Sequence, residues 1–179
     1  MASMTIARPA STEYAPFYGG YVNEVPEGDL LAHLERQGRE TAALLRRITE
    51  SKSQHRYAPG KWTIREVVGH MIDAERVFTY RAMSFARGET SALPSFDENA
   101  WAMTSNAGER PLKDLLDELA AVRSATLALF RGFSDKEFAR SGTASNNHIT
   151  VRALAYIVAG HEKHHVKILR ERYGIENQP

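Results

Sequence analysis

TVRALAYIVAGHEKHHVKILRERY, residues 150–173, has the apolar spacing of one long helix. Its apolar side chains recur every three or four positions, which places them on one face of an α-helix. His161 and His165 fall on that face, because four residues advance a helix by about 400° and about 6 Å. The residues of this face are Val151, Leu154, Val158, His161, His165 and Ile168. The segment therefore predicts a helix whose core-facing side carries two imidazoles.

Three earlier stretches have the same helical spacing. Their apolar residues predict helices over residues 28–50, 63–88 and 111–131. Thr63 followed by Glu66 has the pattern of a capping box, in which each side chain bonds the other residue's backbone N–H at a helix start. No stretch alternates apolar and polar residues as a half-buried strand does. The sequence therefore predicts an all-α protein, a four-helix bundle.

The segments outside these helices are expected to be connections and ends. Residues 1–12 are expected to form a flexible leader, and residues 13–179 a single domain. Residues 14–25, YAPFYGGYVNEV, combine aromatic side chains with glycine and predict an irregular N-terminal arm that lies against the bundle. Residues 51–61 and 141–148 are rich in turn-forming residues, so we expect loops there.

The composition excludes several classes of protein. With 179 residues and a net charge of +1, the chain offers no basic surface for nucleic acid. No apolar run approaches the roughly 18 residues of a membrane span, and the first residues lack the apolar core of a secretion signal, so we expect a cytoplasmic protein without membrane contact. The absence of cysteine excludes disulfides, thiolate metal sites and a cysteine nucleophile. Any metal must therefore be held by nitrogen and oxygen.

A third histidine, His70, lies on the apolar side of the helix predicted over residues 63–88. A single inward histidine is most often a core residue that bonds a neighbour, but three near one core leave several ring nitrogens to satisfy. Each unpaired buried polar group costs about 1–3 kcal/mol. Neutral imidazole is the commonest protein ligand for divalent transition metals, and three protein ligands with one open position are typical of catalytic sites. We therefore predict that His70, His161 and His165 bind one ion: Zn, Ni, Co or Fe(II).

Residues 161–165 also match His-Glu-x-x-His, the metalloprotease signature in which the glutamate acts as general base. The longer signature with a third histidine does not continue, and no strand is predicted that could hold a peptide substrate. Proteolysis is therefore disfavoured. Glu162 is still a candidate catalytic residue for proton transfer beside the ion, and a solvated surface glutamate is the alternative. Arg76 and Arg81 are expected to make surface ion pairs with nearby carboxylates.

Four segments of the chain have a recognisable family pattern. They are RYAPGKWTIRE at 56–66, VGHMIDAER at 68–76, LPSFDENAW at 93–101 and GHEKHH at 160–165. Together they resemble the DinB-like superfamily of four-helix bundles, in its YfiT-related branch, from about residue 13 to residue 173. That family holds its metal with one histidine on the second helix and a His-x-x-x-His pair on the fourth. The resemblance therefore implies that His70, His161 and His165 are metal ligands.

The resemblance also implies a range of functions. Related enzymes include transferases and isomerases that use low-molecular-weight thiols such as bacillithiol or mycothiol, and members are commonly homodimers. A divalent ion deprotonates a coordinating thiol, which then becomes a potent nucleophile. We therefore expect a metal-dependent transferase that acts on a small-molecule thiol and an electrophilic substrate, in a homodimer. The alternatives are a hydrolase in which the ion activates water, and a non-catalytic bundle that the metal stabilises.

Overall fold

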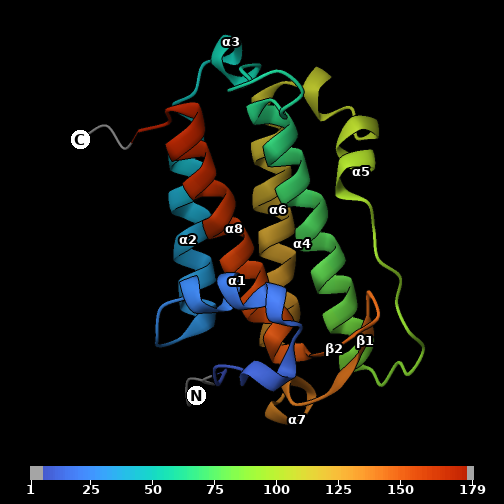
Figure 1. Cartoon of the computed structure of the whole chain (residues 1–179). Coiled ribbons are helices and arrows are strands. Elements are labelled where there is room, and N and C mark those ends of the chain that lie inside the picture. Colours follow the sequence, from blue (N-terminus) through green and yellow to red (C-terminus); the bar gives the residue numbers. More distant parts are fainter. Residues whose placement is uncertain (1–5, 177–179) are drawn as a thin grey trace.

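The computed structural model describes residues 6–176, which form a bundle of four long helices (Figure 1). These helices are α2 (Leu30–Leu45), α4 (Ile64–Ala86), α6 (Leu112–Arg131) and α8 (Val151–Tyr173). Helix α4 packs against α6 and α8, and α2 packs against the same two helices. The predicted all-α four-helix bundle is confirmed. None of the helices in the described part of the chain is long and apolar enough to cross a membrane.

Shorter elements connect the long helices. Among the described residues, three short helices and a hairpin lie between them: α3 (Glu50–Ser53), α5 (Glu98–Thr104), α7 (Asp135–Phe138), β1 (Ser141–Ala144) and β2 (Asn147–Thr150). A further short helix, α1 (Gly19–Glu24), precedes α2. Three 3-10 turns lie at Ser11–Glu13, Pro16–Tyr18 and Ala107–Glu109. The predicted loop between the first two long helices therefore contains one helical turn, α3.

The ends of α4 and α8 lie where their capping residues predict them. The Thr63 hydroxyl accepts a hydrogen bond from the Glu66 N–H, and the Glu66 carboxylate accepts one from the Thr63 N–H at 2.6 Å. The predicted capping box is therefore present at the start of α4. Thr150 caps α8 in a similar way, and Gly174 ends it with a φ of 64°, a left-handed conformation that favours glycine.

The first long helix is shorter than predicted. We expected one helix over residues 28–50, but α2 ends at Leu45 and α3 follows after a break. The Asp29 carboxylate accepts hydrogen bonds from two backbone N–H groups of the first turn and fixes the start of α2. Thr49 caps α3 by accepting a hydrogen bond from the Lys52 N–H. A second N-cap within the predicted helix thus divides it.

The leader expected over residues 1–12 is packed against the protein from residue 6 onward. Ile6 is buried, and Arg8 donates hydrogen bonds to the carbonyl oxygens of Val22 and Val25. Residues 1–5 lie outside the described residues. The expectation of a flexible leader is therefore wrong for residues 6–12, because a buried isoleucine and a bidentate arginine hold this segment in place.

The N-terminal arm is more regular than expected, since residues 19–24 form α1. This helix packs against α8 at Gly160. A Cβ atom at position 160 would lie 2.1 Å from the Tyr21 carbonyl oxygen, so only glycine permits this approach. The close contact brings the ring of Tyr21 to the part of α8 that carries His161.

The predicted loop at residues 141–148 is a β-hairpin instead. Ser145 and Asn146 form its turn with φ values of 51° and 62°, as a two-residue type I′ turn requires. Gly142 faces Phe85 of α4, and a Cβ there would lie 2.2 Å from the phenyl ring. The hairpin was not predicted because its strands are only four residues long and have no apolar alternation.

A polar layer divides the core of the bundle. One apolar cluster includes α4 from Ala74 onward and α8 up to Ala159, and the other includes α4 up to Ile72 and α8 from Val166 onward. Between them all four long helices contribute buried polar side chains. These are Gln37, Thr41, His70, Glu75, Arg123, Thr126, His161, Glu162 and His165. The fold thus gathers many of its buried polar groups at mid-height, although others, such as Arg65 and Arg81, lie elsewhere.

Candidate metal centre

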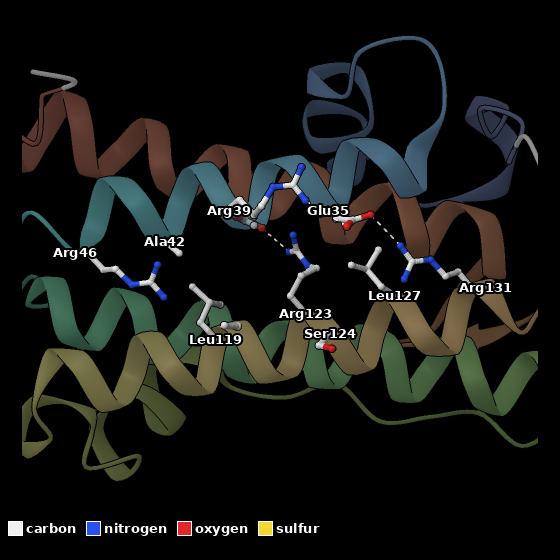
Figure 2. A pocket seen from close by; sticks show the side chains of 12 residues that line it. Glu35, Arg39, Ala42, Arg46, Leu119, Arg123, Ser124, Leu127 and Arg131 are labelled. Carbon is white, nitrogen blue, oxygen red and sulfur yellow. Dashed lines mark hydrogen bonds and ion pairs between the residues drawn. The ribbon is translucent and has the colours of Figure 1, made fainter. Parts of the chain in front are cut away.

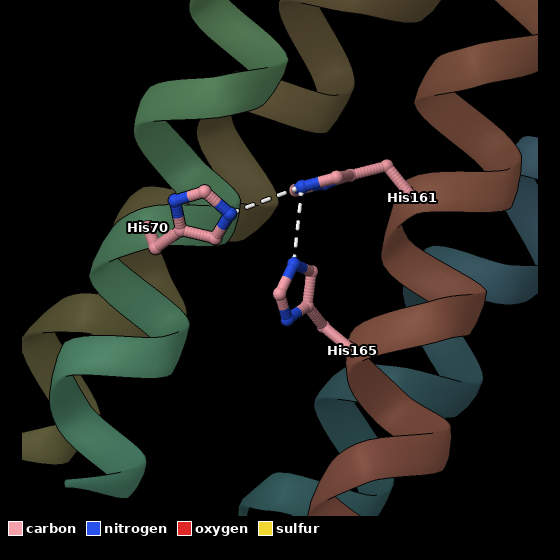
Figure 3. A group of neighbouring side chains, drawn as sticks. All are labelled: His70, His161 and His165. Atoms are coloured by element: carbon pink, nitrogen blue, oxygen red, sulfur yellow. Dashed lines mark hydrogen bonds between the residues drawn. The ribbon is translucent and has the colours of Figure 1, made fainter. Parts of the chain in front are cut away.

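The three predicted histidines meet in this polar layer (Figure 3). His70 comes from α4, His161 and His165 from α8, and all three side chains are buried. The Nε2 atom of His161 lies 3.1 Å from the Nε2 atoms of both His70 and His165. One nitrogen from each ring lies within 4.8 Å of the other two. We call these three residues the histidine cluster.

Packing against aromatic side chains orients the rings. Tyr21 of α1 and Phe78 of α4 meet the ring of His161 edge-on, each at 5.5 Å between centroids. Trp62, just before α4, lies 4.9 Å from the ring of His70. Aromatic contacts of this kind favour defined ring orientations. The sequence did not predict the roles of Phe78 and Trp62, because they come from segments separate from His161 and from the arm.

Hydrogen bonds between the rings cannot satisfy the histidine cluster. The Nε2 atom of His161 faces two other Nε2 atoms, but it has either one proton or one lone pair to offer. The Nδ1 atom of His165 is buried and has no hydrogen-bond partner among the described residues. Three nitrogens about 2.0–2.1 Å from one tetrahedral metal ion would lie about 3.3 Å apart. Two of the three pairs lie 3.1 Å apart, and the third lies within 4.8 Å. The geometry fits a shared cation.

The electrostatic surroundings keep all three imidazoles neutral. Burial lowers the pKa of His70 to about 4 and that of His165 to about 3, and His164 adds a smaller repulsion to both. Burial also lowers the pKa of His161 well below its ordinary value. A neutral imidazole has a free lone pair, which is the form that binds a metal. The cluster is therefore in its ligand form at neutral pH.

Glu162 lies on another side of α8 and belongs to a second polar group. Its carboxylate pairs with Arg123 of α6, which also binds both carboxylate oxygens of Glu75 at 2.8 and 2.9 Å. Thr126 donates a further hydrogen bond to Glu75, and all four side chains are buried. We call these four residues the arginine cluster. Glu162 is thus buried, so the solvated surface position expected as the alternative is wrong. It does not belong to the group of three histidines, and its role in proton transfer stays a prediction.

The arginine cluster holds one guanidinium between two carboxylates, and Glu162 Oε1 is buried without a hydrogen-bond partner among the described residues. Burial alone would lower the pKa of Arg123, but the carboxylates of Glu162 and Glu75 hold it above its ordinary value. Arg123 lies at a groove of about 520 Å³ between α2 and α6 (Figure 2). Arg39 and Arg131 line the same groove and both pair with Glu35. None of the three clustered histidines lines it, so this groove gives no access to them.

Two cavities reach the histidine cluster. One of about 370 Å³ is lined by His70 and His161 together with several aromatic side chains. The other, of about 230 Å³, is lined by His165 and by residues near the start of α4 and the end of α8. Small molecules of the size that such cavities hold could therefore reach all three ligand nitrogens.

Two arginines of α4, Arg76 and Arg81, lie in different environments. Arg76 makes the expected surface ion pair, with Glu118 at 2.6 Å and with Asp73 at 3.9 Å. Arg81 is buried instead and lines the 370 Å³ cavity. Its distance of 11 residues from His70 corresponds to about three helical turns, so both lie on one face of α4. That spacing was the available signal for its position, and the expected surface ion pair of Arg81 is wrong.

Comparison with known proteins agrees with the fold. The profile of the DinB superfamily matches residues 33–169. YfiT of Bacillus subtilis (strain 168), provisionally named a metal-dependent hydrolase, is 26% identical over 126 residues, which cover 69% of this chain and 71% of YfiT. A protein of Geobacillus kaustophilus (strain HTA426) with the same provisional name is 30% identical over 125 residues, covering 66% of this chain and 69% of that protein.

The solved structure of YfiT from Bacillus subtilis, described as an unusual four-helix bundle topology, superposes with a TM-score of 0.74. The match covers 92% of this chain and 95% of that one at 24% sequence identity. At this identity the likeness supports the fold. The family profile, which matches most of the chain, supports the membership.

Proposed function

This chain belongs to the DinB superfamily, and we propose that it binds one divalent transition metal ion through the Nε2 atoms of the histidine cluster. The observation that carries the proposal is the convergence of three buried, neutral imidazole nitrogens from His70, His161 and His165. Three protein ligands leave one position for a ligand from solution, which is typical of catalytic metal sites. The proposed function is therefore a metal-dependent enzyme that uses Zn, Ni, Co or Fe(II).

The surrounding residues prepare the site for chemistry on a small molecule. A bound divalent ion supplies Lewis acidity, which lowers the pKa of a water or a thiol at the open position. Burial lowers the pKa of His70 and His165, so these imidazoles stay unprotonated near neutral pH and keep a lone pair for the metal. The rings of Tyr21 and Phe78 cover His161 on two sides and limit its contact with bulk water. The 370 Å³ cavity admits the substrate.

Hydrolysis is the first candidate reaction, because the relatives are provisionally named metal-dependent hydrolases. Thiol transfer is the second, and the position of Glu162 favours it. This expected general base pairs with Arg123, and among the described residues the cluster contains histidines alone. A thiol needs no protein base once a metal holds it, because coordination removes its proton. Both reactions use the same open position.

Metal analysis of protein purified without a nickel column tests the site. We expect one equivalent of metal per chain in the wild type and in His148→Ala, whose histidine lies exposed on β2. His70→Ala should bind at least about 100-fold more weakly, because two ligands remain. Full stoichiometry in His70→Ala would contradict the proposed centre.

Two assays on the loaded protein then separate the reactions. Turnover of p-nitrophenyl acetate without thiol is expected for a hydrolase, and conjugation of bacillithiol or mycothiol to monobromobimane for a transferase. Absence of both, with a large loss of melting temperature on chelation, would indicate a metal-stabilised bundle without catalysis. The homodimer expected from the family stays a prediction, which sedimentation velocity can check.

A further inference from the structure

Arg81 is a buried guanidinium without a carboxylate partner. Its side chain is 2% exposed, and Nη2 donates hydrogen bonds to the Pro94 carbonyl oxygen at 2.7 Å and to the Ser145 hydroxyl at 2.9 Å. The Tyr18 hydroxyl also interacts with this guanidinium. No carboxylate among residues 6–176 forms an ion pair with it within 4.0 Å. All its known partners are therefore neutral.

The other buried arginines of the described chain are paired. Arg65 pairs with Glu50, and Arg123 pairs with Glu75 and Glu162. A buried charge is costly unless an opposite charge compensates it, and arginine cannot lose its proton in a protein. Arg81 is thus the buried arginine that forms no ion pair with a carboxylate of the described residues within 4.0 Å. An anionic ligand would provide a counter-charge.

The position of Arg81 connects it to the metal centre. Arg81, His70 and His161 line the same cavity of about 370 Å³. On α4, His70 and Arg81 are separated by about three turns, or about 16 Å along the helix axis. Side chains on a helix lean toward its N-terminus, so Arg81 leans toward His70. A ligand in this cavity can therefore contact the guanidinium at one end and the metal centre at the other.

The walls between the two ends are mainly aromatic. Tyr18, Tyr21, Phe78 and Phe96 line the cavity and offer an apolar surface to a ligand. Glu98 is the acidic residue of this lining and lies exposed at the start of α5. The cavity thus combines an apolar body with one buried positive charge, the arrangement expected for an amphipathic anion.

We propose that Arg81 binds the oxyanion group, a carboxylate or phosphate, of a substrate with an apolar body whose reactive centre lies at the histidine cluster. Guanidinium groups match both oxyanions with two parallel hydrogen bonds. The proposal rests on the proposed function, since it assumes that the histidine cluster performs the reaction. It assigns the substrate class that the fold family alone does not give.

Binding to metal-free protein tests the oxyanion site independently of the metal. The probes are 4-phenylbutyrate, its neutral amide 4-phenylbutyramide, and 2-phenylethyl phosphate, measured by isothermal titration calorimetry. We expect wild-type protein to bind one of the two anions at least about tenfold more tightly than the amide. The anion that binds more tightly than the amide indicates whether the site prefers a carboxylate or a phosphate.

Substitutions separate binding from support of the fold. Arg81→Met should abolish the preference, and Arg81→Lys should keep most of it, because the charge remains. Ser145→Ala removes one of the structural hydrogen bonds of Arg81 but leaves its charge, so the preference should remain. Glu98→Gln should raise the affinity for the anion, because it removes a negative charge from the cavity. Equal binding of anion and amide to the wild type, or an unchanged preference in Arg81→Met, would overturn the proposal.

A second experiment connects the oxyanion site to the metal. Protein loaded with Co(II) is titrated with ω-mercapto acids and the matching ω-mercapto alcohols of increasing chain length, and the thiolate-to-cobalt absorption reports binding. We expect the acid to bind about tenfold better than the alcohol at one optimal length in the wild type and equally well in Arg81→Met. No cobalt band, together with an intact anion preference in metal-free protein, would refute the proposed function and leave the oxyanion site standing. A cobalt band without any preference for the acid would refute the oxyanion site and leave the proposed metal centre standing.

Discussion

His161 and Glu162 are neighbours on α8, yet they belong to two buried polar clusters that are built on different principles. In the arginine cluster the Arg123 guanidinium donates hydrogen bonds to two carboxylates and to the Leu34 carbonyl oxygen, and the Thr126 hydroxyl donates to one of the carboxylates. The histidine cluster brings three electron pairs together without a matching cation. The first contains its own counter-charges, with Glu162 Oε1 as its one oxygen without a hydrogen-bond partner among the described residues, and we propose that a metal ion completes the second. A buried polar group that its own chain leaves uncompensated thus points to function.

The difference predicts that the two clusters respond to opposite kinds of change. Removing a member of the arginine cluster should cost stability and leave ligand binding unchanged. Removing a member of the histidine cluster should cost ligand binding and change the stability of the metal-free protein much less. Arg81 follows the second pattern, because it forms no ion pair with a carboxylate of the described residues within 4.0 Å.

Arg123→Met should produce the largest loss of stability. The substitution leaves Glu75 and Glu162 buried without a cation, and breaking a buried ion pair in this way costs about 3–5 kcal/mol. Guanidinium unfolding of metal-free protein measures the loss. Arg131→Met on the same helix is the matched control, because its partner Glu35 is half exposed and such surface pairs contribute about 0–1 kcal/mol. A loss below 1 kcal/mol in Arg123→Met would show that the buried ion pairs of Arg123 do not stabilise the fold as we infer.

The second largest effect is expected for His70→Ala, which should weaken metal binding about 100-fold. A 100-fold loss of affinity corresponds to about 2.7 kcal/mol. Because a ligand that binds only the folded state stabilises it, saturating metal should raise the melting temperature of the wild type and of His148→Ala far more than that of His70→Ala. Differential scanning calorimetry with and without metal gives this comparison. Equal metal-induced stabilisation in all three proteins would place the ion elsewhere.

Much of the fold was predictable from local sequence signals. The capping box of Thr63 and Glu66, the N-cap Thr150 and the glycine after α8 set helix ends that involve neighbouring residues only. The spacing of His161 and His165 placed two ligands on one face for the same reason. Signals of this kind act over a single helical turn and are therefore visible in the sequence.

The remaining features depend on contacts between distant segments. Glu162 was expected beside the ion, but its partner Arg123 lies 39 residues away and leaves no local pattern around Glu162. Arg81 looked like a surface residue until the hairpin and the 93–96 segment covered it. The hairpin itself depends on positive φ values at Ser145 and Asn146, which few non-glycine residues adopt.

The pH dependence of stability tests whether the histidine cluster is buried in its neutral form. The folded-state pKa of His70 lies at about 4, below the unfolded value near 6.5, so the unfolded chain binds more protons as the pH falls. Stability is thus full above pH 6.5 and is lost as the pH falls from 6.5 toward 4. Between pH 6.5 and 5.5 one such histidine contributes about 1 kcal/mol. Over this interval the free energy of unfolding of metal-free His70→Ala should therefore fall by about 1 kcal/mol less than that of the metal-free wild type. An identical pH dependence in the two proteins would contradict the burial of a neutral His70.

Glu162→Gln should also have a small effect, and it tests whether the two clusters act independently. Glutamine still accepts a hydrogen bond from Arg123, and Glu75 still provides a charge, so we expect a loss of about 0.5–1.5 kcal/mol in stability. Metal stoichiometry should not change, and kcat on whichever substrate the wild type turns over should stay within about threefold. Steady-state kinetics at saturating metal measures this. If kcat instead falls by about 100-fold while the metal stays bound, Glu162 transfers protons at the site despite its ion pair, and the two clusters act as one unit.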